Sequence, residues 1–337
     1  MKFWPVILIP LSFLWNIIYG LRRYLYNIGF FPSYDLKRNV ISVGNLSFGG
    51  TGKTPHVIYL SKLLEEEGQS SLILTRGYKS DLEEEGAIVN EDNLLKSGDE
   101  PRLLFENLNS SIVVGRKRYQ NFKKYEENLR ENVIILDDGF QHLKIRRNID
   151  IILIDSTKET RGMHCAAAGE LREHISNLKF ADYVILTKTN LISNEELRNW
   201  NQYLDKKIKV PVYNSKFIFD GLYSIGGKIE SILNKKIVAL SAIGNPLGFE
   251  SSLNSEGFKI TRHFIFKDHY DWNKEELQEV IDFARDQNTV ILTTEKDFMK
   301  IKKIKIELDN IYFMKIKVEL ENEQLFQKEL RKRLFND

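Results

Sequence analysis

The sequence predicts an α/β protein: a mostly parallel sheet with helices on both faces, a smaller C-terminal α/β domain and an apolar N-terminal helix. Short apolar runs alternate with segments of helical periodicity, which is typical of a parallel sheet buried on both faces. A glycine-rich loop joins the first run to the first helical segment, and a second series of runs begins near residue 237. The runs of the first series are residues 40–43, 71–74, 112–114, 133–136, 149–154 and 183–186.

The composition is that of a globular protein without a strong net charge. The 337 residues are 42% hydrophobic and 28% charged, which excludes a disordered chain. The chain has 49 basic and 47 acidic residues, so it lacks the basic excess that is typical of nucleic-acid-binding proteins. We therefore expect no nucleic-acid partner. The single cysteine, Cys165, cannot form an internal disulfide and fits a reducing compartment.

The N-terminal segment, residues 4–19, is strongly apolar and is followed by the basic pair Arg22 and Arg23. A bilayer span needs about 20 apolar residues, and Pro10 and Asn16 interrupt this segment. Basic residues after an apolar run are typical of a helix that lies in the membrane interface. A secretory signal is disfavoured because its basic residues would come first. A transmembrane anchor and a buried core helix stay open as alternatives.

The glycine-rich loop spans residues 44–54, between an apolar strand and a helical segment. Its glycines let successive backbone N–H groups point inward at phosphates, and the helix N-terminus adds partial positive charge. In such a P-loop, Lys53 reaches the β- and γ-phosphates and the Thr54 hydroxyl holds Mg²⁺. The usual spacing requires glycine where this chain has Ser47, and neighbouring glycines supply the flexibility. We therefore predict a P-loop NTPase-like domain.

We divide the chain into four parts. Residues 1–30 form the membrane-interface helix, residues 31–215 the P-loop domain, residues 216–236 a linker, and residues 237–337 a C-terminal α/β domain that closes the cleft. The linker is placed within residues 212–236, where glycines interrupt the pattern. The other expected elements are helices at residues 116–130, 171–180, 274–287 and 324–334, and strands at residues 237–240, 260–266, 290–293 and 311–318.

Two acidic residues, Asp137 and Asp138, follow the apolar strand at residues 133–136. A carboxylate at the end of a buried strand beside a P-loop is the usual Mg²⁺ partner. The alternative is a simple turn, for which Asp-Asp-Gly is favourable. We expect one carboxylate to bind the metal and the other to face a hydroxyl or a cation.

Four further residues could carry chemistry at a cleft between the domains. Asp99 opens a predicted helix and could be only its N-cap, whereas His269 follows a strand of the second domain. Facing each other, they could form a general-base pair in which His269 orients the carboxylate. Arg76 and Arg172 could each neutralise phosphate charge or form a surface ion pair. Residues 292–297, a strand end followed by charged residues, could equally be a helix cap.

Together, these segments resemble the tetraacyldisaccharide 4′-kinases, the lipid A 4′-kinases of Gram-negative bacteria. The resemblance covers nearly the whole chain and rests on a set of motifs in order, which is more specific than any one of them. The motifs are residues 43–45, 49–55, 75–78, 98–101, 137–142, 171–173, 243–246, 266–269 and 294–297.

The resemblance implies that ATP and Mg²⁺ are the cofactors and that an acylated glucosamine disaccharide 1-phosphate is phosphorylated on its 4′-hydroxyl, giving lipid IV-A. Asp99, assisted by His269, would be the base, with Lys53 and Arg76 completing the catalytic set. The other implied site residues are Asn45, Phe48, Gly49, Gly50, Thr51, Gly52 and Thr54 for the nucleotide, Thr54, Asp137 and Asp138 for the metal, and Tyr78, Gln141, His142, Arg172 and Glu173 for substrate or phosphate.

The lipid acceptor lies in a bilayer, so the kinase must come to it. We expect a monomer on the cytoplasmic face of the inner membrane, peripheral or monotopic, held by its N-terminal helix. Two other functions stay open: a membrane-associated nucleotide switch, and a soluble small-molecule kinase with a buried N-terminal helix. The second-domain motif around His269 argues against a simple switch.

Overall fold

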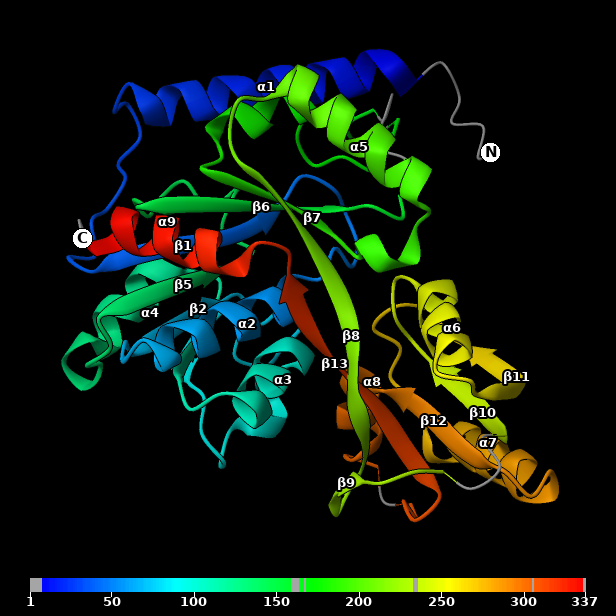
Figure 1. The fold of residues 1–337 in the computed structure, drawn as a ribbon. Helices are drawn as coiled ribbons and strands as arrows, with labels where there is room; N and C mark the ends of the chain where they lie inside the picture. The colour runs from blue at the N-terminus through cyan, green and yellow to red at the C-terminus, as the bar shows by residue number, and fades with distance from the viewer. Residues whose placement is uncertain (1–7, 159–163, 167, 233–235, 305, 336–337) are drawn as a thin grey trace.

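A computed structural model describes residues 8–158, 164–166, 168–232, 236–304 and 306–335. One 13-stranded sheet runs through the described part of the chain in the order β11-β10-β12-β13-β8-β7-β6-β1-β5-β2-β4-β3, and β9 (Gly227–Ile229) pairs with β8 outside this path (Figure 1). Most of its strand pairs are parallel, and helices lie on both faces. The predicted α/β class is confirmed.

The N-terminal lobe is built around β1 (Asn39–Asn45), which lies between the parallel strands β5 (Val133–Asp137) and β6 (Ile149–Asp155). These strands are mostly apolar because both faces are covered. One face packs on α2 (Lys53–Glu66) and α3 (Asp99–Asn107), and the other on α4 (Arg118–Tyr125) and α5 (Asn194–Lys207). The remaining strands of this lobe are β2 (Ser71–Thr75), β3 (Ala87–Ile88), β4 (Ser111–Val114) and β7 (Tyr183–Thr187).

The C-terminal lobe repeats the α/β arrangement on a smaller scale. Its parallel strands are β11, β10, β12 and β13, and helices pack on both sides of them. The bounds are β10 (Lys236–Ser241), α6 (Pro246–Ser255), β11 (Lys259–Ile265), α7 (Lys274–Asp286), β12 (Val290–Thr294), α8 (Glu295–Ile301) and β13 (Ile311–Leu320). Thr294 caps α8 through its side chain, as one interpretation of this segment allowed.

A long two-stranded ribbon joins the lobes where the sequence suggested an interrupted pattern. Strand β8 (Val212–Ser224) pairs in parallel with β7 at its start and antiparallel with β13 along most of its length. The last helix, α9 (Glu323–Phe335), then returns to the core of the N-terminal lobe, where Phe326 is fully buried against Tyr183 and Tyr213. The four-part domain division stays a prediction, although residues 216–224 lie in a regular strand.

One expected helix is wrong in its first four residues, and the rest of it is a 3₁₀ helix rather than an α-helix. Residues 171–180 were predicted as helical, but Leu171 forms isolated bridges with Ser47 and Cys165, and only a 3₁₀ helix, η4 (Ile175–Phe180), follows. The backbone N–H groups of Arg172 and Glu173 bond to the Leu46 carbonyl, and together with the bridges of Leu171 they hold this segment against the P-loop strand in a non-helical conformation. Helices α5, α6 and α8 and strands β3, β8 and β9 were not predicted as such.

Helix α1 (Ile9–Asn27) lies across the N-terminal lobe, above β6 and beside α5 (Figure 1). Its outer face is apolar: Phe13 is 66% exposed, and Leu14, Ile17 and Ile18 are about half exposed. Its buried residues are instead the polar Ser12 and Arg23. None of the helices in the described ranges combines the length and apolar character needed to cross a membrane. Residues 4–7 of the predicted apolar segment lie outside the described residues.

Candidate functional site

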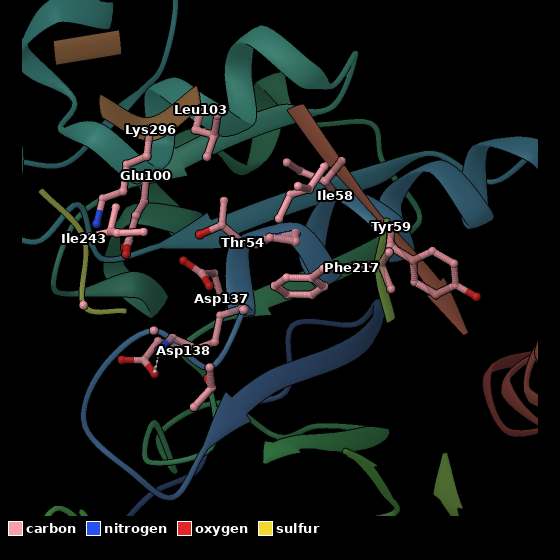
Figure 2. Close-up of a pocket in the computed structure, with 18 of the residues that line it drawn as sticks. Thr54, Ile58, Tyr59, Glu100, Leu103, Asp137, Asp138, Phe217, Ile243 and Lys296 are labelled. Atoms are coloured by element: carbon pink, nitrogen blue, oxygen red, sulfur yellow. Dashed lines mark ion pairs between the residues drawn. The ribbon is translucent and has the colours of Figure 1, made fainter. Parts of the chain in front are cut away.

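A cleft of about 1310 Å³ opens between the lobes at the carboxyl ends of the N-terminal strands. The P-loop, the strand ends after β2 and β5, and residues 243–245 and 268–269 of the C-terminal lobe all line it. Figure 2 shows Asp137 and Asp138 close to Thr54, with Glu100 and Lys296 on one side and Tyr59 and Phe217 on the other. This is where ligands bind in open α/β sheets.

The P-loop conformation explains how the chain manages without the usual first glycine. Gly49 and Gly52 adopt left-handed backbone angles, with φ of 97° and 88°, which side chains disfavour. Ser47 has no positive φ and instead forms a bridge with Leu171, so a side chain is tolerated there. Asn45 donates from Nδ2 to the Thr51 hydroxyl at 2.8 Å and braces the loop from inside rather than lining the cleft.

The outer side of the loop is held through its carbonyl groups. Lys188 donates from Nζ to the Gly50 carbonyl at 2.8 Å and pairs with the buried Asp155. The Thr187 hydroxyl donates to the Thr51 carbonyl at 3.0 Å. These bonds fix the loop conformation in which N–H groups other than those of Phe48 and Thr51, which bond to the Glu170 and Gly49 carbonyls, can face the cleft. No sequence pattern marked these residues, although Asp155 ends β6, Thr187 ends β7 and Lys188 follows it at the same edge of the sheet.

The two adjacent aspartates occupy opposite electrostatic environments. Asp138 lies 3.4 Å from Lys53 and accepts two bonds from Arg172 Nη1, at 2.8 and 2.9 Å. Burial alone would raise its pKa, but Lys53 and Arg172 hold the pKa of Asp138 well below its usual range. Asp138 therefore stays ionised and joins the P-loop lysine to the predicted phosphate-binding arginine.

Asp137 carries an unused acceptor atom. Its Oδ2 accepts a 2.8 Å bond from the Thr75 hydroxyl, whereas its buried Oδ1 has no hydrogen-bond partner among the described residues. Burial, followed by the negative charges of Glu100 and Asp138, raises the pKa of Asp137 to about 6. An orphaned buried carboxylate oxygen beside the Thr54 side chain suits a bound cation (Figure 2). In the described ranges, no group of three or more His, Cys, Asp or Glu side chains could hold a metal alone.

Asp99 and His269 come from different lobes and contact each other; His269 lines the cleft, whereas Asp99 lies behind it and is not among the lining residues. His269 Nδ1 lies 3.5 Å from Asp99 Oδ2, and the buried Lys300 Nζ lies 3.6 Å from the same oxygen. Burial would raise the pKa of Asp99, but the His269 hydrogen bond and the Lys300 charge lower it to about 2. His269 itself has a φ of 60°, an unusual conformation that turns its ring toward the cleft. Lys296 approaches the other ring nitrogen at 3.3 Å.

The other predicted residues divide into cleft and interior positions. Arg76 lines the cleft and pairs with Glu83 at 2.6 Å. Burial, with nearby cations, lowers the pKa of His142 to about 3, so its ring is neutral at pH 7. Glu173 is 1% exposed, does not line the cleft and pairs with Arg23. Also at the cleft are Phe48, Gly49, Gly50, Thr51, Gly52, Lys53, Thr54, Tyr78, Gln141 and Arg172.

Three residues at the site were missed because only the fold brings them there. Glu100 adjoins Asp99 in a motif, yet nothing in its spacing showed that it would approach Asp137. Arg118 lies at the start of α4 and donates to the Asp138 carbonyl at 3.3 Å. Lys300 reaches Asp99 from α8 in the other lobe. The roles of all these residues in binding and catalysis stay predictions.

Comparison with known proteins identifies the family. The family model described as tetraacyldisaccharide-1-P 4′-kinase matches residues 4–335. The chain belongs to this family. Curated relatives named tetraacyldisaccharide 4′-kinase include one from Desulfotalea psychrophila, 36% identical over 89% of this chain and 88% of the relative, and one from Halothermothrix orenii, 32% identical over 89% and 84%.

A solved structure agrees over almost the full length. It is described as the "apo" form of LpxK from Aquifex aeolicus in complex with ATP, and it has a TM-score of 0.77 and 30% identity, covering 97% of this chain and 98% of the other. The resemblance inferred from the sequence is confirmed, and the chain is a kinase of lipid A biosynthesis. The nucleotide-switch alternative is therefore set aside.

We predict that Lys188→Met weakens ATP binding. Loss of one charge-assisted hydrogen bond to the P-loop should raise the KM for ATP about tenfold. The Lys188→Met/Asp155→Asn variant removes the unpaired buried carboxylate that the single change leaves behind and is the folding control. Steady-state kinetics with varied ATP, next to thermal unfolding, provide the measurement. An unchanged KM in a folded double variant would contradict the role of Lys188.

Proposed function

We propose that the cleft transfers the γ-phosphoryl group of ATP to the 4′-hydroxyl of a tetraacyldisaccharide 1-phosphate, giving lipid IV-A. The observation that carries the proposal is the contact between Asp99 and His269, an acid and an imidazole from different lobes that meet beside a P-loop. A nucleotide switch needs the P-loop but has no use for an acid–imidazole pair on the facing wall. A kinase with a hydroxyl acceptor needs both.

The nucleotide half of the site is assigned to the P-loop. Backbone N–H groups of residues 49, 50 and 52–54, at the N-terminus of α2, would bind the phosphates, whereas those of Phe48 and Thr51 bond to the Glu170 and Gly49 carbonyls. Lys53 would exchange its 3.4 Å contact with Asp138 for the β- and γ-phosphates. Arg172 and Arg76 would neutralise charge on the transferring group. The name of the solved relative, a complex with ATP, supports ATP as the donor.

The residues present fit a Mg²⁺ ion, which we propose as the second cofactor. Asp137 would supply its free Oδ1 and Thr54 its hydroxyl, with the nucleotide phosphates completing the coordination. When bound, the ion would neutralise charge on the β- and γ-phosphates. Asp138 is already paired with Lys53 and Arg172, so Asp137 is the better candidate of the two.

Asp99 is assigned the role of base. Its ionised carboxylate would accept the 4′-hydroxyl proton as the O4′–phosphorus bond forms and the bond from phosphorus to the β,γ-bridging oxygen breaks, releasing ADP. His269 would hold the carboxylate in position and share the proton. Lys300 would help His269 to hold the carboxylate, because its ammonium group lies 3.6 Å from the same oxygen, Oδ2. Tyr78, Gln141 and His142, which line the cleft, would contact the sugar or its phosphate.

The acceptor is a lipid, and we propose that α1 brings the enzyme to the inner-membrane surface as a peripheral protein on the cytoplasmic face. The support is the outward apolar face of Phe13, Leu14, Ile17 and Ile18. A contiguous exposed apolar surface on one helix is typical of membrane contact. A buried core helix would turn these side chains inward instead.

The base assignment predicts the effect of Asp99→Asn. Phosphoryl transfer to the disaccharide lipid should fall about 10²- to 10⁴-fold, the usual contribution of a general base, while ATP affinity changes less than about threefold. Glu106→Gln, a change of a surface acid on the same helix, is the matched control. Transfer of ³²P from ATP measures the first quantity and a fluorescent ATP analogue the second. Near-normal transfer by Asp99→Asn would remove Asp99 as base.

The raised pKa of Asp137, about 6, predicts a pH-dependent need for metal. A carboxylate must lose its proton to bind Mg²⁺, so the Mg²⁺ concentration for half-activity should rise as pH falls below about 6, by up to about tenfold per pH unit. Above pH 7 it should be constant. Asp137→Asn should need far more Mg²⁺ at every pH and lose this dependence. The same dependence in the variant would assign the titration to another group.

The membrane proposal predicts that Ile17→Glu/Ile18→Glu abolishes flotation with vesicles of phosphatidylethanolamine and phosphatidylglycerol. Two carboxylates on the apolar face cannot enter the acyl region without a large desolvation cost. Leu325→Glu, which places a charge at a half-exposed leucine of α9, is the control and should float normally. Equal flotation of the double variant and the unmodified protein would contradict the assignment.

A further inference from the structure

Helix α1 does more than present an apolar surface, because its inward side chains bond to the backbone of the site loops. Trp15 donates from Nε1 to the Arg172 carbonyl at 3.0 Å. Arg22 donates from both terminal nitrogens to the Gln141 carbonyl at 3.1 Å. Ser12 donates to the Cys165 carbonyl at 2.9 Å. Donors on one helix therefore satisfy carbonyls in two segments that are far apart in sequence.

Arg23 is the centre of this contact. It is 5% exposed, and its Nη2 donates to the Phe140 carbonyl at 3.3 Å and to Glu173 Oε2 at 3.1 Å. The guanidinium also stacks over the rings of Phe140 and Phe180, at 4.2 and 4.9 Å from their centroids. Glu173, 1% exposed, accepts a further bond from Asn177. A buried pair with these additional partners specifies one arrangement of its loops.

The same two loops carry groups of the phosphate site on their other side. Arg172 points into the cleft and bonds Asp138, while its neighbour Glu173 points away and bonds Arg23. Gln141, whose carbonyl is held by Arg22, donates from its side chain to the Asn45 carbonyl at 3.0 Å. The loops are thus joined twice, by Arg172 and Asp138 at the cleft and by Arg23 and Glu173 behind it.

We infer that Arg23 and Glu173 are positioning residues: the pair fixes the Arg172 loop against the Asp138 loop, so that α1 organises the phosphate site as well as meeting the lipid surface. The inference rests on the proposed nucleotide half of the site. The resemblance implied that Glu173 contacts substrate or phosphate. We assign it instead to a position behind the loop, where it pairs with Arg23. The inference also means that helix α1 has one side that faces the lipid and another side that faces the phosphate site.

The test separates site geometry from membrane contact. Arg23→Met should weaken binding of a fluorescent ATP analogue about tenfold or more in detergent-free buffer without lipid, since it removes charge-assisted bonds to both loops. Its flotation with vesicles should equal that of the unmodified protein. Ile17→Glu/Ile18→Glu should show the reverse, with normal ATP binding and no flotation. If helix α1 only anchored the protein to the membrane, none of these variants would change ATP binding.

A second variant excludes simple misfolding. Arg23→Met leaves Glu173 buried and unpaired, which destabilises the protein. Arg23→Met/Glu173→Gln removes that charge, so it should recover the unfolding temperature yet keep the weakened ATP binding, while Arg23→Lys should be intermediate in ATP binding. Trp15→Phe, which removes only the bond to the Arg172 carbonyl, should show a smaller loss. Normal ATP binding by a folded double variant would overturn the inference, whereas no ATP binding by the unmodified protein would overturn the proposed function.

Discussion

The ribbon of β8 and β13 is the constraint on which the site depends. Asp99 starts a helix of the N-terminal lobe and His269 follows a strand of the C-terminal lobe, so neither lobe contains the pair. The ribbon is paired from Phe313 with Tyr223 to Leu320 with Ser215, and backbone hydrogen bonds thus continue from one lobe to the other. A flexible linker would leave the distance between Asp99 and His269 unspecified. A continuous sheet restricts how far the two lobes can move, and therefore restricts that distance.

Side-chain contacts between the lobes add to this constraint. Arg102 of α3 donates from Nη1 to the Met299 carbonyl of α8 at 2.7 Å, and Asn107 donates to Glu295 at 2.9 Å. Both contacts lie on the helix that begins with Asp99. Asp99, the proposed base, is therefore held by the same surface that brings Lys300 to it. Alignment of reacting groups in this way is the main contribution a protein makes to phosphoryl transfer.

Charge is divided sharply within the cleft. Asp138 lies among Lys53, Arg172 and the buried Arg118, whereas the adjacent Asp137 faces a hydroxyl and Glu100. Two carboxylates one residue apart thus have pKa values moved in opposite directions, which is how one fold assigns different roles to chemically identical groups. The cause is the set of neighbours: Lys53 and Arg172 lower the pKa of Asp138, whereas burial and Glu100 raise the pKa of Asp137.

Local sequence was sufficient for the elements whose signal is periodic or motif-based. The buried strands, the P-loop and the apolar α1 all follow from short-range pattern, and the linked motifs identified the family. The pattern did not predict β8, because a half-covered strand that contains a glycine looks like a linker. It also predicted a helix over residues 171–180, because it could not show that the backbone at the start of this segment bonds to Leu46. Glu173 shows the limit most clearly: its motif marks it as a site residue, but only packing shows that it faces Arg23. Sequence determines which chemical groups are available and their local conformation, whereas the direction in which a group such as Glu173 or Asp99 points depends on partners far away in the chain, here Arg23 and His269.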